Sequence, residues 1–526
     1  MATIIDTIKL TNEFCSVLTD IERTGMKVRL DRLDRMEDEF RNKFNKLKAY
    51  LDGSVSYFMG DTPINLGSPE QLSKVIFSRS INSKTRWANE FGLVPNMKSA
   101  HKMYKLSSVT KQSFVGLVRK NTTVMYKTQA IQCPTCKGKG RLSLKNKDGS
   151  EGKRPRICNS NLKKLLPFRF ATICDGLGYT LKSTPNVAGL GCIPRATDVS
   201  ASGFSTDKEV IERCLKTAKG KAKLFLEALL EYNMIDSKLN NLIPGIRKGL
   251  VGDMLHPTFN QAVTATGRLS SKNPNVQNFP RGTTFPIKQI FTSRWEGGKL
   301  LEVDYSGLEF VAAVELSGDE EGTRQTLEKE DKHGYTARYL RNRGQETSRQ
   351  EAKSVTFLPL YGGSSGTDAE VEYCKHFYEL HPGIAKWHGR LTEEVIANKR
   401  ITLPSGRFYS FPNAVRTARG CTSSTQVKNY PVQGFATADI VPCSVVAVYR
   451  VLQGYNSKII NTVHDSIIVD IHPDEVDIVP KLVYTTMIEV DKELLRRYGY
   501  KAKLPFRAEA SIGPNWFNLS EIDNLK

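Results

Sequence analysis

Two aspartates in this sequence lie beside short apolar runs that are typical of β-strands. Asp304 ends the run at residues 299–304, and Asp465 lies between the runs at residues 458–463 and 466–471, which predict an antiparallel hairpin. Either aspartate alone would more often be a capping or surface residue. If the two strand ends meet at one sheet edge, their carboxylates repel each other and need a cation. Oxygen ligands suit Mg²⁺, and two such ions about 4 Å apart can activate a hydroxyl and stabilise a leaving phosphate.

A segment between these aspartates, residues 349–362, has the pattern of a helix with a functional face. Side chains spaced four apart share one face of a helix, which here presents two cations and then two aromatic rings. Such a face can hold a triphosphate at one end and a sugar and base at the other. The alternative is a solvated helix with a buried aromatic end. The four side chains are Arg349, Lys353, Phe357 and Tyr361.

In their order along the chain, residues 304–309, 349–362 and 463–465 resemble the three polymerase motifs of family A DNA polymerases, the bacterial polymerase I and phage replicative type. The resemblance covers nearly the whole chain outside residues 81–200. It implies a right-hand polymerase fold of the α+β class and template-directed DNA synthesis in replication, for a phage or similar replicon. Further segments that match the family are residues 22–25, 65–72, 264–271, 274–278, 429–434, 438–439 and 513–516.

The resemblance also implies a role for each site residue. Asp304 and Asp465 would bind two Mg²⁺ ions, helped by the backbone carbonyl of Tyr305. Arg349 and Lys353 would clamp the incoming triphosphate and neutralise the charge that builds up during phosphoryl transfer.

The rest of the nucleotide site and the DNA contacts follow from the same resemblance. Phe357 would pack on the deoxyribose, and Tyr361 would stack near the templating base. Glu309 would crowd the sugar 2′ position and so exclude ribonucleotides. The residues implied to contact the primer-template are Arg268, Gln277, Asn429, Gln433 and His464.

Three residues depart from the family pattern. Phe310 stands where the family usually has an arginine after the glutamate of its first motif, so we expect the local packing or a salt bridge there to differ. Ser466 stands where the family usually has an acid after its His-Asp pair, so any contribution of a third carboxylate at that position is lost. The family treats that acid as auxiliary, and we expect activity to survive. Pro359 lies inside the nucleotide-binding helix, where a proline costs roughly 3 kcal/mol, so we expect a kinked or shortened helix.

The resemblance divides the chain into thumb, palm and fingers with one insertion. The family's thumb begins near residue 13, so we expect no proofreading exonuclease domain before it. The predicted regions are the thumb at 1–80 and 201–250, a basic insertion at 81–200, the palm at 251–318 and 432–526, and the fingers at 319–431.

Composition limits the classes of protein that this chain can belong to. Its 526 residues are 39% hydrophobic and 25% charged, which excludes wholesale disorder and collagen-like repeats. The N-terminus lacks a basic start followed by an apolar run, and no stretch of about 18 apolar residues occurs. We therefore expect a soluble cytoplasmic protein without a signal peptide and without a membrane partner, in the host cytoplasm if a phage encodes it. Ten scattered cysteines fit a reducing compartment.

Positive charge is concentrated in the predicted insertion. The whole chain has a formal net charge of +21, and residues 81–200 contribute +17 of it, from 22 lysines and arginines against 5 acids. Such an imbalance attracts polyanions, so this segment predicts a contact with nucleic acid. A well-solvated surface is the alternative.

The insertion also carries a cysteine pattern. Cys133 and Cys136 are spaced like the knuckle of a zinc ribbon, in which two thiolates bind one tetrahedral ion. Cys158 and Cys174 could complete a four-cysteine zinc site, although their spacing is loose. Unrelated thiols and buried cysteines in a loop-rich module are the alternative.

The expected enzyme is a DNA-directed DNA polymerase whose partners are primer-template DNA and dNTPs. Replisome proteins, including a separate exonuclease or a processivity factor, are further expected partners. One rival is a single-subunit RNA polymerase, which Glu309 at the sugar gate argues against. The other is a noncatalytic DNA-binding subunit, against which the retained Asp304 and Asp465 weigh.

Overall fold

The computed structural model describes residues 2–59, 64–77, 93–95, 104–106, 131–144, 150, 155–159, 176, 179–180, 189–200, 203–280, 282–418, 420–523 and 525. The chain forms two compact units. One combines Met1–Glu37 with Asn241–Lys526, and the other is Asp38–Asn240. The predicted thumb segment 1–80 is thus divided between the two units, and the predicted domain boundaries stay a prediction.

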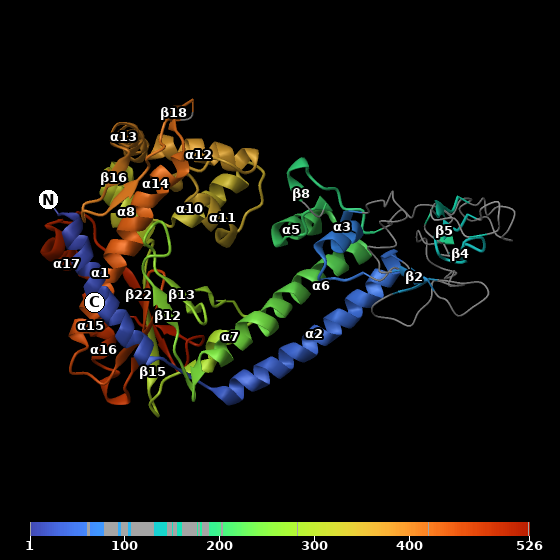
Figure 1. Ribbon diagram of the computed structural model, residues 1–526. Helices are drawn as coiled ribbons and strands as arrows, with labels where there is room; N and C mark the ends of the chain where they lie inside the picture. Colours follow the sequence, from blue (N-terminus) through green and yellow to red (C-terminus); the bar gives the residue numbers. More distant parts are fainter. Residues whose placement is uncertain are drawn as a thin grey trace. The chain divides into compact units, whose positions relative to one another are not determined.

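An antiparallel five-stranded sheet forms the centre of the first unit (Figure 1). Its strands are rich in valine and isoleucine, which suit a pleated surface. The hairpin predicted around Asp465 is confirmed, because β20 and β21 pair through Val463 and Ser466. In spatial order the strands are β20 (Lys458–Val463), β21 (Ser466–Ile471), β15 (Lys299–Tyr305), β22 (Ala508–Gly513) and β23 (Ser520–Glu521).

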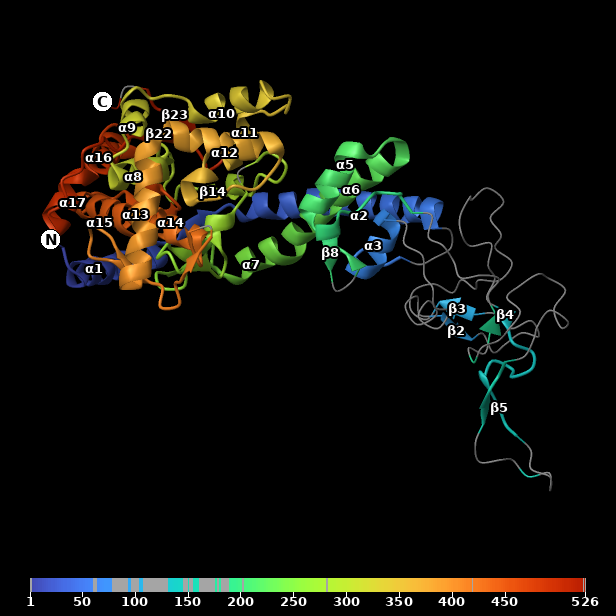
Figure 2. The same cartoon turned by 90° about the horizontal axis from the view of Figure 1, so that it is seen from above.

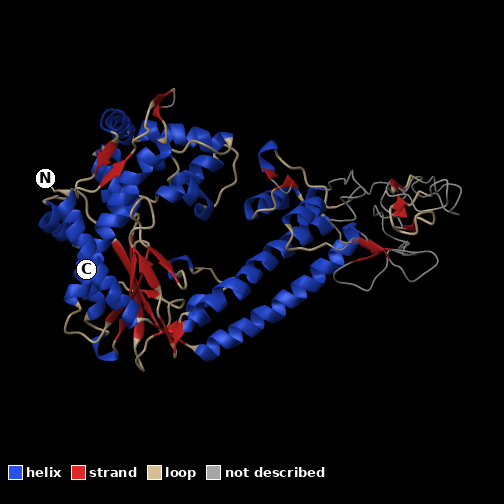
Figure 3. Ribbon diagram, in the orientation of Figure 1, coloured by secondary structure: helices blue, strands red, loops and turns tan. Residues whose placement is uncertain are grey.

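Helices pack against this sheet (Figure 3). Helix α16 (Val479–Ile488) contacts β15 and β22, and α15 (Val441–Val451) contacts β20. Helix α1 (Ile4–Thr24) lies along α15 and β20, and its core-facing residues include Phe14 and Ile21. The sheet therefore presents only part of its surface to anything that the protein binds.

The longest apolar helical run of the first unit passes through this core. It joins α14 (Ser424–Gln433), the π-helical η7 (Gly434–Ile440) and α15 without a break. By length and composition the run Ser424–Val451 could cross a membrane, yet 89% of its apolar 18-residue stretch is buried inside the protein. That burial is typical of a core helix.

A helical layer follows β15 in the chain. Helices α8, α13 and α14 pack side by side in it, and α10 packs on α11 and α12 (Figure 2). Two small hairpins accompany these helices, β16 (Arg400–Thr402) with β17 (Phe408–Ser410) and β18 (Arg416–Thr417) with β19 (Gly420–Cys421). The helices are α8 (Leu308–Ser317), α9 (Glu320–Leu327), α10 (Lys332–Arg341), α11 (Arg349–Thr356), α12 (Asp368–Leu380) and α13 (Pro382–Asn398).

Short strands complete the first unit. The strands of a small sheet are, in order, β10 (Leu250–Val251), β11 (Met254–Leu255), β1 (Met26–Val28) and β14 (Phe291–Thr292). A separate hairpin pairs β12 (Thr258–Asn260) with β13 (Ser270–Lys272) and holds the loop between them.

The second unit is mainly helical where it is described. It contains most of α2 (Leu30–Met59), with α3 (Pro69–Phe77), α5 (Lys208–Thr217) and α6 (Gly220–Ser237). Between α3 and α5 the described chain forms short strand pairs, of which β5 (Arg141–Leu142) with β6 (Arg156–Ile157) is one. Its core includes Leu51, Val75, Ile211, Phe225 and Leu229.

Candidate active site

The two predicted metal-binding aspartates lie at neighbouring strand ends. Asp304 pairs in register with Ser466 of β21, and the backbone N–H of Tyr305 donates to the carbonyl of Asp465 at 3.2 Å. Asp465 belongs to the tight turn of the β20–β21 hairpin, where His464 adopts a left-handed φ of 60°. Both aspartates are half-buried. The expectation that the two strand ends meet at one end of the sheet is confirmed.

Tyr305 directs its side chain away from this site. Its hydroxyl lies 2.6 Å from Ser444 Oγ on α15 and donates to the Met487 carbonyl on α16 at 2.6 Å. Burial raises the pKa of the Tyr305 phenol far above its ordinary value. The phenol therefore ties the sheet to its covering helices.

Glu309, in the first turn of α8, connects the strand end to the helical layer. The Tyr361 hydroxyl donates a hydrogen bond to the Glu309 carboxylate. Burial raises the pKa of Glu309, the positive charge of Arg268 opposes that rise, and the negative charge of Asp465 adds to it. Arg268 and Asp465 therefore act in opposite directions on the charge of Glu309.

The helix predicted over residues 349–362 is shorter in the structure. Helix α11 ends at Thr356 and is followed by η6 (Pro359–Tyr361), a 3₁₀ turn that starts at the proline. The missing N–H of Pro359 explains this break, and the expectation of a shortened helix is confirmed. The prediction of one continuous helical face with four side chains is wrong, because Phe357 caps α11 and Tyr361 lies in η6.

The cationic end of α11 is open to solvent. Arg349 and Lys353 are both exposed. Arg349 Nε lies 2.9 Å and 3.1 Å from the two carboxylate oxygens of Asp331, the N-cap of α10. This contact raises the pKa of Arg349 and lowers that of Asp331. A bound anion would have to compete with Asp331 for the guanidinium.

His333 is a neighbour of this face that sequence reasoning missed. Its Nδ1 lies 3.1 Å from Thr356 Oγ1, and its ring meets that of Phe357 edge-on with centroids 5.1 Å apart. Burial, followed by the charges of Arg349 and Lys353, lowers the pKa of His333 below its ordinary value. The spacing of residues along α11 could not predict this neighbour, because His333 belongs to a different helix, α10.

The residues predicted to contact DNA come from several segments of the first unit. Gln277, in η4 (Val276–Asn278), is buried, and its amide donates to the Thr462 carbonyl of β20 at 3.4 Å. Asn429 and Gln433 are one turn apart on α14 and both are half-buried. Arg268 is half-buried, and its Nε has no hydrogen-bond partner among the described residues.

A buried ion pair supports the loop that carries Arg268. Arg407 Nε contacts Asp439 Oδ1 at 3.0 Å, and Ser405 Oγ donates to Asp439 Oδ2 at 2.6 Å. Gly267 has a φ of +83°, and a Cβ there would lie 2.9 Å from Ala438 Cβ, so the loop needs glycine at this point.

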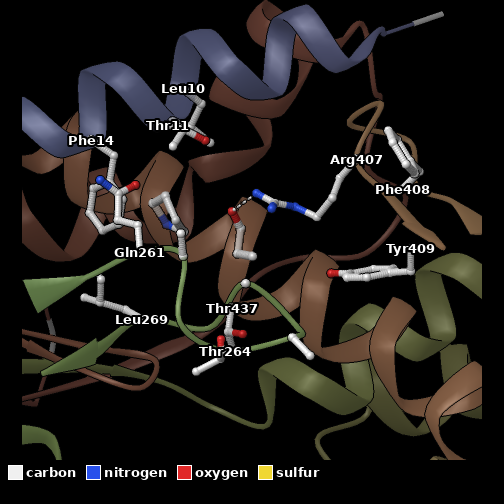
Figure 4. Close-up of a pocket in the computed structure, with 15 residues that line it drawn as sticks. Leu10, Thr11, Phe14, Gln261, Thr264, Leu269, Arg407, Phe408, Tyr409 and Thr437 are labelled. Atoms are coloured by element: carbon white, nitrogen blue, oxygen red, sulfur yellow. Dashed lines mark hydrogen bonds between the residues drawn. The ribbon is translucent and has the colours of Figure 1, made fainter.

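A cavity lies behind the same loop. Its volume is about 290 Å³, and Figure 4 shows Phe14, Thr264, Arg407 and Thr437 among its lining residues. The Tyr409 hydroxyl donates to the Thr266 carbonyl at 2.7 Å and fixes the loop from another side. The cavity therefore belongs to the scaffold of the Arg268 loop.

Three of the four predicted zinc ligands come together. The Sγ atoms of Cys133, Cys136 and Cys158 lie within 4.8 Å of one another, and all three residues are buried. Cys133 Sγ and Cys158 Sγ are 3.8 Å apart, which is about the edge of a tetrahedron with Zn–S bonds of about 2.3 Å. Cys174 lies outside the described residues, although the N–H of Gly176 donates to the Cys158 carbonyl at 3.1 Å.

Comparisons with known proteins agree with this architecture. The sequence profile of DNA polymerase family A matches residues 188–518. DNA polymerase I of Streptococcus pneumoniae serotype 4 (strain ATCC BAA-334 / TIGR4) is 28% identical over 360 residues, which cover 62% of this chain and 38% of the relative. The thermostable DNA polymerase I of Thermus filiformis is 28% identical over 346 residues, 62% of this chain and 40% of the relative. The chain thus spans about two fifths of the length of these curated relatives.

A solved structure shares the fold. It is described as the POL domain of Pol1 from M. smegmatis in complex with DNA primer-template and dNTP. The TM-score is 0.64 at 19% sequence identity, and the match covers 96% of this chain and 70% of that chain. The mixed α and β architecture predicted from the sequence is therefore that of a polymerase POL domain.

Proposed function

The chain belongs to DNA polymerase family A, and on this premise we propose that it extends a DNA primer with dNTPs along a DNA template by phosphoryl transfer. The observation that carries the proposal is the pairing of strand β15 with the β20–β21 hairpin, which brings Asp304 and Asp465 to one end of the sheet. Glu309, Arg268 and the cationic end of α11 belong to the same unit.

The donor set at the sheet end fits Mg²⁺. It offers carboxylate and carbonyl oxygens, which this ion prefers, and the two half-buried acids need a cation between them. Asp304 and Asp465 would hold two ions together with the Tyr305 carbonyl. When bound, Mg²⁺ lowers the pKa of the primer hydroxyl and neutralises charge on the phosphates.

Side chains of the helical layer would bind the nucleotide. Arg349 and Lys353 are exposed cations one turn apart, and they would hold the triphosphate, with Arg349 leaving Asp331 to do so. The positive charges of both residues contribute to the lowered pKa of His333. Phe357 would contact the deoxyribose.

The Glu309–Tyr361 hydrogen bond supports a sugar gate that selects dNTPs. The Tyr361 hydroxyl holds the Glu309 carboxylate in a fixed position, and a carboxylate fixed beside the sugar would exclude a 2′-hydroxyl by contact and repulsion. Tyr361 would also stack near the templating base.

Primer-template DNA is the proposed macromolecular partner. The half-buried Arg268 would contact the growing end, together with Gln433, Asn429, His464 and Gln277. The related POL-domain structure is a complex with primer-template and dNTP, which supports both partners. The sequence resemblance is the basis for further proposals: a separate exonuclease and a processivity factor as partners, a cytoplasmic location, and a role in the replication of a phage. The matched relatives are bacterial.

The basic insertion would bind zinc and extend the contact with DNA. The three converging thiols support a zinc site, and the proposal of Cys174 as the fourth ligand rests on the sequence pattern alone. A structural zinc would stabilise a lysine-rich segment with little apolar core. Metal analysis of the purified protein should find one zinc per chain, and its absence would contradict this assignment.

A primer-extension assay tests the proposed activity. The purified chain is incubated with a labelled DNA primer-template, Mg²⁺ and either dNTPs or rNTPs. Extension with dNTPs is the expected result. Extension with rNTPs alone would favour the single-subunit RNA polymerase alternative, and no extension would favour a noncatalytic DNA-binding subunit.

A further inference from the structure

Glu302 is an acid on the catalytic face of the sheet that the roles described so far leave unused. It lies two residues before Asp304 on strand β15, so both side chains project from the same face. Two residues of an antiparallel strand span about 6.8 Å, which puts Glu302 one step behind Asp304. Glu302 is half-buried, as Asp304 is.

Ser466 connects Glu302 to both predicted metal ligands. It pairs directly with Asp304 across the strands and follows Asp465 in the chain. Residues that face each other in an antiparallel pair project to the same side. The buried Ser466 Oγ lies 3.2 Å from Glu302 Oε1 and 3.0 Å from the Val463 carbonyl. The Glu302 carboxylate is thus oriented by a residue that adjoins both aspartates.

The hydrogen-bond partner of the Glu302 carboxylate is a neutral group. No lysine, arginine or histidine among the described residues forms an ion pair with its carboxylate. The neutral Ser466 hydroxyl donates a hydrogen bond to this carboxylate. A partly buried carboxylate next to further carboxylates favours a cation in the shared space.

The residue types at positions 302 and 466 complement each other. An acid at position 466, where the family usually has one, would place a second negative charge against Glu302. Serine is small and can donate a hydrogen bond, so it accommodates the acid on β15. The neighbouring strand β15 thus carries an acid, Glu302, in contact with the position where the family usually has one.

We propose that Glu302 is the third carboxylate of the divalent-cation site, a positioning residue that accepts hydrogen bonds from the water molecules of the bound ions. This inference rests on the proposed function, because it places the ions at Asp304 and Asp465. Removing such a carboxylate weakens the binding of the ions, since their hydration water loses an acceptor and the site loses a negative charge.

Mn²⁺ binding to the full chain tests this inference, with the electron paramagnetic resonance signal of free Mn²⁺ as the readout. Glu302→Gln keeps the shape and an acceptor for Ser466 but removes the charge. We expect Mn²⁺ affinity to fall about tenfold. Glu302→Asp should recover part of that affinity because it restores the charge. Glu521→Gln, on the exposed strand β23 of the same sheet, is the matched control and should bind like the wild type.

The outcomes separate the two claims. If Asp304→Asn loses Mn²⁺ affinity while Glu302→Gln binds like the wild type, the proposed metal site stands and the role of Glu302 is refuted. If Asp304→Asn binds like the wild type, the metal site itself is wrong, and the inference falls with it. A purely structural role for Glu302 would predict that Ser466→Ala perturbs thermal unfolding while Glu302→Gln leaves Mn²⁺ affinity unchanged.

Discussion

Releasing Arg349 from Asp331 should tighten nucleotide binding. The change is Asp331→Asn, which removes the charge that holds the guanidinium. The N-cap of α10 should survive, because asparagine is as good a cap as aspartate and can accept from the Gly334 N–H as Asp331 Oδ1 does at 3.1 Å. Stability should therefore change little, whereas Arg349 no longer has to exchange one carboxylate partner for a phosphate.

The size of the effect follows from the exposure of the pair. The side chains of Arg349 and Asp331 are 58% and 48% exposed, so solvent screens their attraction. Exposed ion pairs contribute about 0.2–1 kcal/mol, which sets the decrease in the apparent Kd for dNTP at no more than about fivefold. Because Arg349 lowers the pKa of Asp331, the pair is intact above the ordinary Asp pKa and is lost only as the pH falls through that lowered value. An assay near pH 8 thus compares the wild type, in which the Arg349–Asp331 pair is fully ionised, with a variant that lacks the pair.

Single-turnover incorporation as a function of dNTP concentration measures this effect. At low salt the apparent Kd for dNTP should be lower in Asp331→Asn than in the wild type. The difference should decrease at high salt, where screening weakens the Arg349–Asp331 pair in the wild type. Asp253→Asn, which removes a half-buried ion pair with Lys27 elsewhere in the same unit, is the control and should leave the Kd unchanged. A weaker dNTP affinity in Asp331→Asn, or no change at low salt, would refute the competition between Asp331 and the triphosphate.

Three further predictions concern the sugar gate, the buried ion pair and the basic insertion. Glu309→Ala should raise the ratio of ribonucleotide to deoxyribonucleotide incorporation, and Tyr361→Phe should shift it the same way by less, because the gate loses its fixed position; unchanged ratios would exclude this gate. Arg407→Ala leaves the buried Asp439 carboxylate without its ion-pair partner and should lower the free energy of unfolding by about 3–5 kcal/mol in denaturant titrations. Arg407→Lys should lower it less, and equal stability of the two variants would contradict the role of the pair. A Gly/Ser linker in place of residues 81–200 should weaken DNA affinity and flatten its salt dependence while single-nucleotide addition at saturating DNA persists; an unchanged salt slope would favour a protein-docking role.

The sequence was sufficient for the parts of the site that depend on local pattern. Asp304 ends one apolar run and Asp465 lies between two others, and strand pairing brings both aspartates to one end of the sheet. The break at Pro359 also follows from local chemistry, since proline lacks the N–H that a helix interior needs. The spacing of four residues, however, predicted one face through Tyr361, and the same proline prevents it.

Contacts between elements that are distant in sequence could not be read from a pattern. His333 reaches Phe357 because α10 packs on α11. The Arg407–Asp439 pair forms because the turn between β16 and β17 contacts η7 through Ser405 and Arg407. The position of Glu302 beside Ser466 depends on the register of β15 with β21. Each of these pairings is set by tertiary packing, which single-sequence periodicity does not encode.

The most direct test of the catalytic proposal is single-nucleotide addition by Asp304→Asn and Asp465→Asn. Both variants should lose several orders of magnitude in addition rate and keep their affinity for primer-template DNA, because the acids would hold the ions rather than the duplex. Asp474→Asn, at an exposed position outside the sheet, is the matched control and should extend primers like the wild type. Near-normal addition by either Asp304→Asn or Asp465→Asn would contradict the assignment of the active site.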